Sequence, residues 1–312
     1  MRIAVVGVGA VGRYFGGRLH QAGLDVVFIA RGKTLEALKS DGLRIESIAG
    51  DLEIAKPNVV GSPAEAGPAD VVLVAVKATQ VKDVAGTLKP LVGSDTVVIP
   101  MQNGLEAPTL LGDALGKEAV IGGLCKIFAS QTDLRTVKHV GLDPTIEFGE
   151  LDRSKSERVE RVRAAFAPAQ GMMSVVPEDI EVAMWQKLLY VEPLGGVGAV
   201  SRAPIGVVRA VPETREMLAA AMREVVTVAL KRGVAMNPQA AELALDRIDK
   251  LAPGTTASMH RDIVEGRPSE LEAQVGVVVR YAREAGVPTP VHSTLYAALL
   301  PSELRARGHL PG

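Results

Sequence analysis

Three glycines near the start of the chain constrain its fold more than any other feature. Gly7, Gly9 and Gly12 form the pattern G-x-G-x-x-G, directly after an apolar run at residues 3–6 and directly before a helical stretch. In this setting the first glycine permits a tight turn, the second lets the backbone approach a diphosphate, and the third lets helix and strand pack closely. The pattern predicts a βαβ unit that binds a dinucleotide at a helix N-terminus, through Gly7, Gly9, Ala10, Val11 and Gly12.

Further short apolar runs follow the glycines. Residues 26–29, 71–76 and 96–99 are nearly continuous apolar stretches, as in parallel strands covered on both faces. Helical patterns separate them, and this alternation predicts an α/β fold with a Rossmann-type doubly wound sheet. Shorter runs near residues 43–54 and 145–148 are expected to be edge strands.

The second half of the chain has a helical apolar period. Residues 217–229 mark one apolar helix face, and Gly233 stands where such a helix would end. We therefore expect a cofactor-binding Rossmann domain over residues 1–177 and an all-helical, substrate-binding domain over residues 178–312. The segment from Pro301 onward is expected to be a short, loosely held tail.

The end of the second predicted strand indicates which dinucleotide is bound. An NAD-binding chain usually carries a carboxylate there for the ribose 2′-hydroxyl. Here the sequence is Ile29-Ala30-Arg31-Gly32-Lys33, with no carboxylate. The guanidinium of Arg31 suits a 2′-phosphate, and Lys33 is placed to assist. The alternative is an ordinary solvated cation, but the position favours NADPH.

Composition excludes several classes of function. The net charge is −1 and no basic run occurs, so nucleic-acid binding is not expected. A single cysteine, Cys125, excludes an internal disulfide and indicates a reducing compartment. No targeting or membrane-spanning segment is evident, and we expect a cytoplasmic protein. The five histidines are dispersed, so no metal site is expected.

Two polar residues follow predicted strands, at the sheet edge where ligands bind in folds of this class. Lys77 follows residues 71–76, and Asn103 follows residues 96–99 in Gln102-Asn103-Gly104. Each has a plainer interpretation, a surface lysine and an ordinary turn respectively.

Lys187 lies in the middle of an apolar helical stripe. Its neighbours at helical spacing are Ile180, Ala183, Met184, Tyr190, Val191 and Leu194. Such a lysine either extends outward to solvent or is held inside for a purpose. Burial would make its ammonium group readier to release a proton, as a general acid requires.

Glu270 stands at a predicted helix start. In Pro268-Ser269-Glu270-Leu271-Glu272, Ser269 is expected to be the N-cap and Glu272 to complete a capping box. That arrangement leaves Glu270 without a structural role. A carboxylate in the first turn of a helix is favoured as the anion, which suits it to orient a substrate hydroxyl or a lysine.

Taken together, these motifs resemble the ketopantoate reductase (2-dehydropantoate 2-reductase) family. The resemblance covers nearly the whole chain and rests on Gly7, Gly9, Gly12, Arg31, Val76-Lys77-Ala78, Gln102-Asn103-Gly104, Trp185-Gln186-Lys187-Leu188, Ser258-Met259-His260-Arg261-Asp262 and Glu270. It implies an oxidoreductase that uses NADPH to reduce a 2-keto acid to a 2-hydroxy acid, with ketopantoate, a precursor in pantothenate biosynthesis, as the first candidate substrate. It also implies a cleft between a Rossmann domain and a helical domain.

The same resemblance implies roles for individual residues. Lys187 would protonate the carbonyl oxygen and Glu270 would hydrogen-bond the substrate hydroxyl. Ser258 would bind the substrate carboxylate, while Asn103 and Lys77 would hold the nicotinamide ribose and the substrate. The helical half offers a face for a homodimer, although the sequence does not indicate which surface.

The chain departs from the family pattern at two positions. Family members typically have substrate-contacting asparagines four and eight residues after the catalytic lysine, where this chain has Val191 and Gly195. Glu192 is a candidate replacement, although it lies about 100° around the helix from Val191. Two alternatives therefore stay open: a reductase of the same fold acting on another carbonyl or imine, and a non-catalytic protein that senses NADPH.

Overall fold

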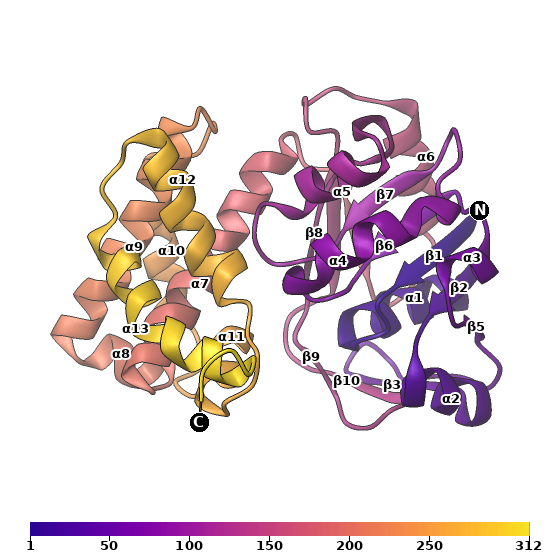
Figure 1. Ribbon diagram of the computed structural model, residues 1–312, viewed down its shortest axis with the longest axis horizontal. Coiled ribbons are helices and arrows are strands. Elements are labelled where there is room, and N and C mark those ends of the chain that lie inside the picture. Colours follow the sequence, from indigo (N-terminus) through magenta and orange to yellow (C-terminus); the bar gives the residue numbers. More distant parts are fainter. Residues whose placement is uncertain (312) are drawn as a thin grey trace. The chain divides into compact units, whose positions relative to one another are not determined.

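The computed structural model describes residues 1–311, which divide into two compact units (Figure 1). The first unit comprises Met1–Gln102 and Glu106–Ile180, and the second comprises Asn103–Leu105 and residues 181–311. Apart from the short segment Asn103–Leu105, the chain passes from the first unit to the second at the start of helix α7 (Ile180–Ser201). The first unit is α/β and the second is helical.

A five-stranded parallel sheet forms the centre of the first unit. Its strand order is β5-β2-β1-β6-β7. The strands are β1 (Arg2–Val6), β2 (Asp25–Ile29), β5 (Asn58–Val60), β6 (Val71–Val74) and β7 (Val97–Pro100). The four strands predicted from the apolar runs are confirmed, and the pairing of β2, β1, β6 and β7 is that of a Rossmann-type sheet.

Helices cover this sheet and complete the first unit. They are α1 (Ala10–Gln21), α2 (Gly32–Asp41), α3 (Pro63–Ala66), α4 (Val81–Ala85), α5 (Ala107–Leu115) and α6 (Glu157–Phe166), with 3₁₀ turns η1 (Ala78–Gln80), η2 (Gly86–Leu91) and η3 (Lys117–Ala119).

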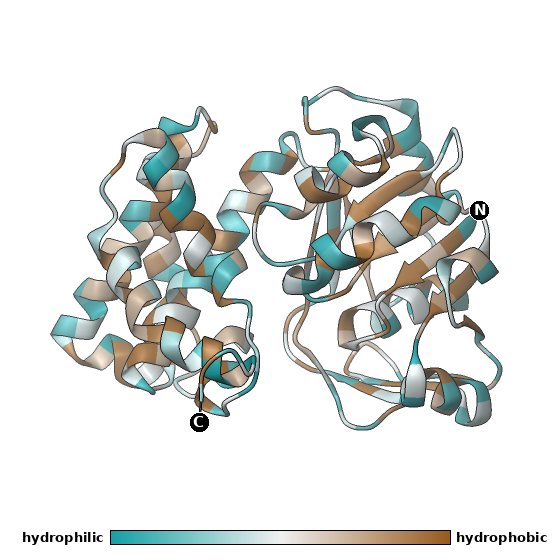
Figure 2. Ribbon diagram, in the orientation of Figure 1, coloured by the Kyte–Doolittle hydropathy of each residue, from teal (hydrophilic) through white to brown (hydrophobic). Residues whose placement is uncertain are grey.

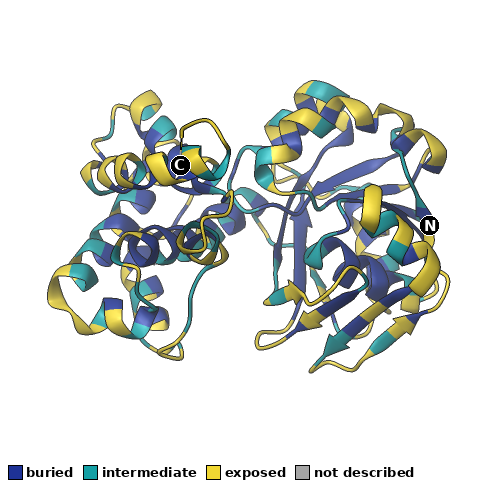
Figure 3. Ribbon diagram, turned by 60° about the horizontal axis from the view of Figure 1, so that its bottom comes forward, coloured by how far each residue is buried: buried dark blue, intermediate teal, exposed yellow. Residues whose placement is uncertain are grey.

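Both faces of the parallel sheet are buried. Ile3 and Val5 of β1 belong to one apolar cluster, whereas Ala4 and Val6 belong to a second. Successive side chains of a strand point to opposite faces, so a strand covered on both sides must be apolar at every position. The hydropathy colouring shows the resulting continuous apolar strands (Figure 2), and the burial colouring shows them enclosed by partly exposed helices (Figure 3).

Two smaller sheets were only partly anticipated. One has the order β4-β3-β10-β9, with β3 (Leu43–Ser47), β4 (Leu52–Ile54), β9 (Ala129–Gln131) and β10 (Thr136–His139). The other has the order β12-β11-β8, with β8 (Gly122–Lys126), β11 (Thr145–Gly149) and β12 (Met173–Val175).

The expectation that residues 145–148 form an edge strand is wrong. β11 lies in the middle of its sheet, paired with β8 on one side and β12 on the other. All five of its residues are buried. Likewise β3 is internal to its sheet, whereas β4, like β9, is at an edge. The partners are distant in sequence, so the local pattern of residues 145–148 carried no information about them.

The second unit is built from helices. After α7 come α8 (Ile205–Ala210), α9 (Pro212–Lys231), α10 (Ala240–Ile248), α11 (Ser258–Val264), a π-helical turn η4 (Glu272–Gly276), α12 (Val277–Ala285) and α13 (Pro290–Ala306). Gly233, with φ +83°, follows the end of α9 as predicted. Within residues 1–311, no helix is both long enough and apolar enough to cross a membrane.

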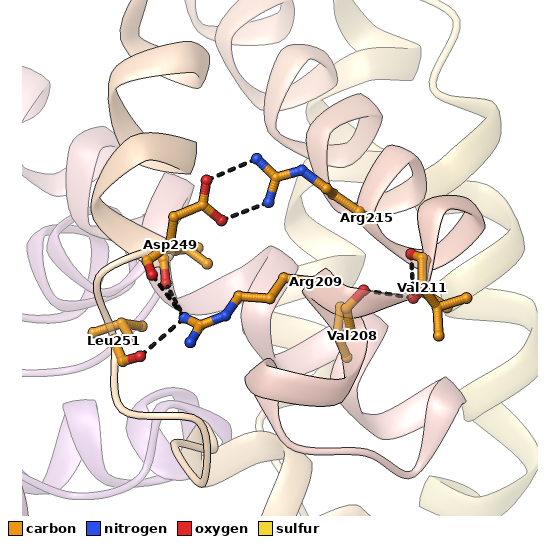
Figure 4. Close-up of polar contacts among 8 residues, drawn as sticks. Val208, Arg209, Val211, Arg215, Asp249 and Leu251 are labelled. Carbon is orange, nitrogen blue, oxygen red and sulfur yellow. Dashed lines mark hydrogen bonds and ion pairs between the residues drawn. The ribbon is translucent and has the colours of Figure 1, made fainter.

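Two arginines hold the end of α10 (Figure 4). Arg209 donates through one nitrogen to the carbonyl oxygens of Ile248, Asp249 and Leu251 at 2.9–3.0 Å. Arg215 forms a two-point ion pair with the carboxylate of Asp249. Helix C-termini leave carbonyl groups without intrahelical donors, and a cation there satisfies them and complements the helix dipole. These contacts join α8, α9 and α10.

The expected loose tail from Pro301 onward is wrong. α13 continues through Pro301 to Ala306, and Glu303 is 4% exposed. Its carboxylate accepts hydrogen bonds from the backbone N–H of Ser269, at 3.0 and 3.2 Å, and from the Ser269 hydroxyl, at 2.6 Å. Arg307 in turn donates to Glu303 at 2.6 Å. The sequence did not reveal that this end of the chain supplies a buried acceptor.

Candidate functional site

The glycine turn between β1 and α1 has the geometry of a diphosphate cradle. Gly7 has φ +93°, a conformation that side chains rarely adopt, and a Cβ there would lie 2.5 Å from the backbone nitrogen of Val76. A Cβ on Gly12 would lie 2.1 Å from the carbonyl oxygen of Gly7. By contrast, the nearest atom to a Cβ on Gly9 is Nε2 of Gln131, at 3.4 Å. Gly7 and Gly12 are thus needed for the turn itself, whereas a Cβ on Gly9 would meet only the end of one flexible side chain.

The first N–H groups of α1 follow directly after Gly9. The helix begins at Ala10, and its N-cap, Gly9, supplies no side chain to accept their hydrogen bonds. The leading N–H groups of a helix, here those of Ala10, Val11 and Gly12, have no intrahelical acceptor, so an anion is favoured beside them. The residues present therefore fit the diphosphate of a dinucleotide.

Arg31 shares a cavity with the glycine turn. It is the N-cap residue of α2, at the end of β2, and its side chain is exposed. A cavity of about 220 Å³ is lined by residues that include Gly7, Arg31, Thr34, Pro63 and Gln80. The predicted cation and the predicted turn thus lie on one surface of the first unit. Thr34 in α2 and Gln80 in η1 gave no signal in the sequence, because a single polar residue forms no periodic pattern.

β6 ends earlier than predicted, and this places Lys77. The strand stops at Val74 rather than at residue 76. Val76 bends toward Gly7, whose missing side chain leaves room for it. The side-chain amide of Gln102 donates to the carbonyl oxygens of Val74, at 2.7 Å, and Val76, at 3.0 Å, and so holds the bend. Lys77 follows with an exposed side chain, and its backbone N–H donates to Gln80 at 3.2 Å.

Asn103 and Glu270 lie together in the second unit although they are far apart in sequence. Nδ2 of Asn103 donates to Oε2 of Glu270 at 3.0 Å. The next residue, Gly104, has φ +96°, and a Cβ there would lie 2.5 Å from the carbonyl oxygen of Ala273. Glycine is therefore required at residue 104 for the loop to approach the π-helical turn η4. The plain-turn interpretation of Asn103-Gly104 does not explain this contact.

The expected capping box at Ser269 is wrong. The Ser269 hydroxyl does accept from the backbone N–H of Leu271, at 3.1 Å. Its own N–H, however, donates to Glu303 and not to Glu272. Glu272 is instead paired with Arg280 and accepts from the hydroxyl of Tyr296 at 2.7 Å. The sequence pattern identified the helix start but not the long-range acceptor that replaces the local one.

Lys187 and Ser258 lie on two different helices of the second unit. Lys187 is half-buried on α7, between the two extremes expected for it. Ser258 is the first residue of α11 and is exposed. Within residues 1–311, no hydrogen bond joins Lys187 or Ser258 to the Asn103–Glu270 pair.

Glu192 does not stand in for the missing asparagines. Its side chain is fully buried, and its Oε2 accepts from Nε2 of His292 at 2.8 Å. Nδ1 of His292 donates to Glu224 at 2.6 Å. Burial alone would lower the pKa of His292, but the two carboxylates outweigh it and raise that pKa to about 9. Glu192 therefore belongs to a buried ionic network joining α7, α9 and α13.

Gly195 is covered by residues of the second unit. A Cβ there would lie 2.7 Å from the terminal methyl group of Met259 and 3.5 Å from the side chain of Ala257. Met259 is 1% exposed. The volume next to Gly195 is thus filled by an apolar side chain, whereas Val191, one turn closer to Lys187, is half-buried.

Comparison with known proteins agrees with the motifs. The model of the family described as "Ketopantoate reductase PanE/ApbA" matches residues 3–153, and that of its C-terminal part matches residues 179–303. The chain is 32% identical over 303 residues to the 2-dehydropantoate 2-reductase of Nostoc sp., covering 96% of this chain and 94% of that protein. It is 31% identical over 299 residues to the uncharacterized oxidoreductase YkpB of Bacillus subtilis, covering 96% and 98% of the two chains.

Solved structures give the same result. The 2-dehydropantoate 2-reductase of Geobacter metallireducens superposes with a TM-score of 0.90 at 30% identity, covering 97% of this chain and all of that chain. A D-mandelate dehydrogenase with NADH shares the fold at 21% identity, with a TM-score of 0.85 over 98% of this chain and all of the other. The resemblance inferred from the motifs is confirmed, and the chain belongs to the ketopantoate reductase family of NADPH-dependent oxidoreductases.

Proposed function

We propose that this chain reduces a 2-keto acid to a 2-hydroxy acid with NADPH, and that ketopantoate is the first candidate substrate. The observation that carries the proposal is that Gly7 and Arg31 line the same cavity. It combines a backbone cradle for a diphosphate with a guanidinium suited to a 2′-phosphate. Membership of a family whose curated relatives include 2-dehydropantoate 2-reductases supports the reaction.

The two halves of the chain then have separate tasks. Residues 1–177 bind NADPH through Gly7, Gly9, Ala10, Val11, Gly12 and Arg31, with Lys77 and Asn103 toward the nicotinamide ribose. Residues 178–312 supply the substrate-binding groups Lys187, Ser258 and Glu270, together with Asn103.

The chemistry divides between cofactor and protein. Bound NADPH supplies the hydride to the carbonyl carbon, so the protein's task is to orient the substrate and manage charge. Nζ of Lys187 donates a proton to the carbonyl oxygen as negative charge develops there. Glu270 accepts a hydrogen bond from the substrate hydroxyl, and the Ser258 hydroxyl donates to the substrate carboxylate.

A second candidate, a less polar 2-keto acid, is favoured by one observation. The position of the second family asparagine is glycine, and Met259 fills the space beside it. Glu192 is occupied by His292 and is not available as a substitute. A site that lacks these polar groups holds a substrate hydroxyl less tightly, because that hydroxyl leaves water without full compensation.

The test is NADPH oxidation by the purified protein with ketopantoate and with trimethylpyruvate, which lacks only the hydroxyl of ketopantoate. A clear preference for ketopantoate supports the first candidate. Preference for trimethylpyruvate or another keto acid supports the second. Cofactor binding without turnover of any keto acid would overturn the enzymatic proposal and favour an NADPH-sensing protein.

Lys187→Ala tests the proton donor. We expect loss of turnover by roughly a hundredfold or more, with NADPH binding retained, since the proposed role lies in the transition state. Lys231→Ala, at an exposed lysine of α9, is the matched control and should leave turnover unchanged. Near-normal turnover of Lys187→Ala would remove this residue from the mechanism.

A further inference from the structure

A buried glutamine contacts the carboxylate of Glu270. Gln274 lies in the π-helical turn η4, immediately before α12, and is 1% exposed. Its Nε2 donates to Oε2 of Glu270 at 3.2 Å. Nδ2 of Asn103 donates to the same oxygen at 3.0 Å. One carboxylate oxygen therefore accepts hydrogen bonds from two side-chain amides that belong to different segments of the second unit.

The orientation of the Gln274 amide follows from this contact. A carboxylate oxygen accepts hydrogen bonds, so the NH₂ group and not the carbonyl oxygen of Gln274 must face it. The carbonyl oxygen, Oε1, is then buried without a hydrogen-bond partner in residues 1–311. An unsatisfied buried acceptor costs about 1–3 kcal/mol, and an apolar side chain of similar length would avoid that cost. Stability alone therefore does not account for glutamine at residue 274.

The local backbone is also unusual at this position. π-helical turns are rare and are frequently found at functional sites. Here the turn places Gln274 with its backbone N–H donating to the carbonyl oxygen of Glu270 at 3.0 Å, while Gly104 packs against the carbonyl oxygen of Ala273. The charged side chains nearby, Glu272 and Arg280, are paired with each other. Side chain and backbone of Gln274 thus both bond to Glu270.

We propose that Gln274 is a positioning residue that, together with Asn103, fixes the orientation of the Glu270 carboxylate toward the substrate hydroxyl. The inference rests on the proposed function, in which Glu270 contacts that hydroxyl. Gln274 lies four residues after Glu270, the spacing of neighbours on one helix face, but a single polar residue gives no further signal in the sequence.

Two substitutions test the proposal in the full-length enzyme. Gln274→Met keeps the length of the side chain and removes the donor. We expect kcat/KM for the best keto acid substrate to fall roughly ten- to hundredfold, which corresponds to loss of a hydrogen bond to a charged group. NADPH affinity, measured by titration without keto acid, should stay within about twofold because Gln274 has no role in cofactor binding.

Gln274→Glu adds a readout that a merely structural role would not change. Two ionised carboxylates repel each other, but a protonated Glu at residue 274 can donate to Glu270 as the amide does. The loss of kcat/KM in this variant, relative to the wild type, should therefore shrink as the pH is lowered. The loss of kcat/KM in Gln274→Met should not vary with pH. Wild-type kcat/KM in Gln274→Met, or the same pH-independent deficit in both variants, would overturn the proposal.

A double-mutant cycle with Glu270→Gln separates this inference from the proposed function. If Gln274 acts through Glu270, Gln274→Met should have little further effect in the Glu270→Gln background. Full activity of Glu270→Gln would contradict the proposed role of Glu270 itself. A damaged Glu270→Gln together with independent, additive effects of the two substitutions would contradict only the positioning role of Gln274. Urea unfolding of each variant identifies losses that come from misfolding.

Discussion

The carboxylate of Glu192 accepts a hydrogen bond from the ring of His292, and both side chains are fully buried in the helical unit. The carboxylate of Glu224 accepts a hydrogen bond from the other ring nitrogen, Nδ1, so a charged imidazole lies between two carboxylates. Breaking such a buried pair leaves an uncompensated charge and is strongly destabilising. The network therefore links the stability of the helical unit to pH.

Stability should decline at alkaline pH through His292. Its pKa is about 9 in the folded protein, above the ordinary value of 6.5, so its contribution is complete below pH 6.5 and disappears as the pH rises through 9. The loss amounts to about 3 kcal/mol at most. Urea unfolding at several pH values measures this loss in the free energy of unfolding. The fluorescence of Trp185, the single tryptophan, reports on this unit, to which it belongs. In His292→Gln the side chain at residue 292 no longer titrates, so the alkaline decline in stability should disappear. An equal decline in that variant would assign the effect to other groups.

Removal of the Glu303 carboxylate should destabilise the helical unit. Glu303→Leu leaves the N–H and hydroxyl of Ser269 without their acceptor and leaves Arg307 with only the carbonyl oxygen of Ser269. We expect the free energy of unfolding to fall by about 2–3 kcal/mol in urea titrations. Glu303→Gln retains an acceptor and should lose less. Wild-type stability of Glu303→Leu would show that the Glu303 carboxylate does not stabilise this unit.

Two glycines of the turn should respond differently to alanine. Gly12→Ala places a methyl group against the carbonyl oxygen of Gly7, where only backbone could give way, and should cost about 1–3 kcal/mol of stability. Gly9→Ala meets only the flexible end of Gln131, so it should fold normally. Its methyl group occupies the space proposed for the diphosphate, so NADPH affinity should fall at least about tenfold. Thermal unfolding and NADPH titration of both variants test this; wild-type affinity of Gly9→Ala contradicts it.

Arg31→Asp should change the cofactor preference. A carboxylate at residue 31 repels a 2′-phosphate and can accept from a 2′-hydroxyl, so NADPH affinity should fall strongly while NADH affinity is kept or improved. Lys33→Asp, two residues further along α2, is the comparison and should have the smaller effect. Dissociation constants for both cofactors give the ratio. An unchanged NADPH/NADH preference in Arg31→Asp would refute the assignment of the 2′-phosphate site.

Val191→Asn should improve the use of ketopantoate if the missing amide is a defect of the site. The new amide lies one helical turn after Lys187 and can bond the substrate hydroxyl, which corresponds to a gain of up to about tenfold in kcat/KM. The gain should be absent with trimethylpyruvate, which has no hydroxyl. Val200→Asn, at an exposed position of the same helix, is the control. No gain with ketopantoate would indicate a pocket shaped for another ligand.

Part of the candidate site could be predicted because its requirements are local. Gly7 needs a positive φ and Gly12 needs the absence of a side chain, and both requirements follow from a strand–turn–helix that spans few residues. The position of Arg31 at the end of β2 follows in the same way from an apolar run and where it stops. For Lys187, by contrast, the sequence left two interpretations open: a side chain that extends to solvent, or one that is held inside for a purpose.

What the sequence alone determined is therefore the Rossmann-type sheet, the glycine turn, the helical second half and the family. Periodicity and backbone conformation are set by neighbouring residues, so they can be read along the chain. Only the tertiary structure decided that Glu192 pairs with His292, Ser269 with Glu303, and Glu270 with Asn103 and Gln274. Most of these partners are many residues apart, and a buried polar group finds its partner only when long-range packing brings the two together.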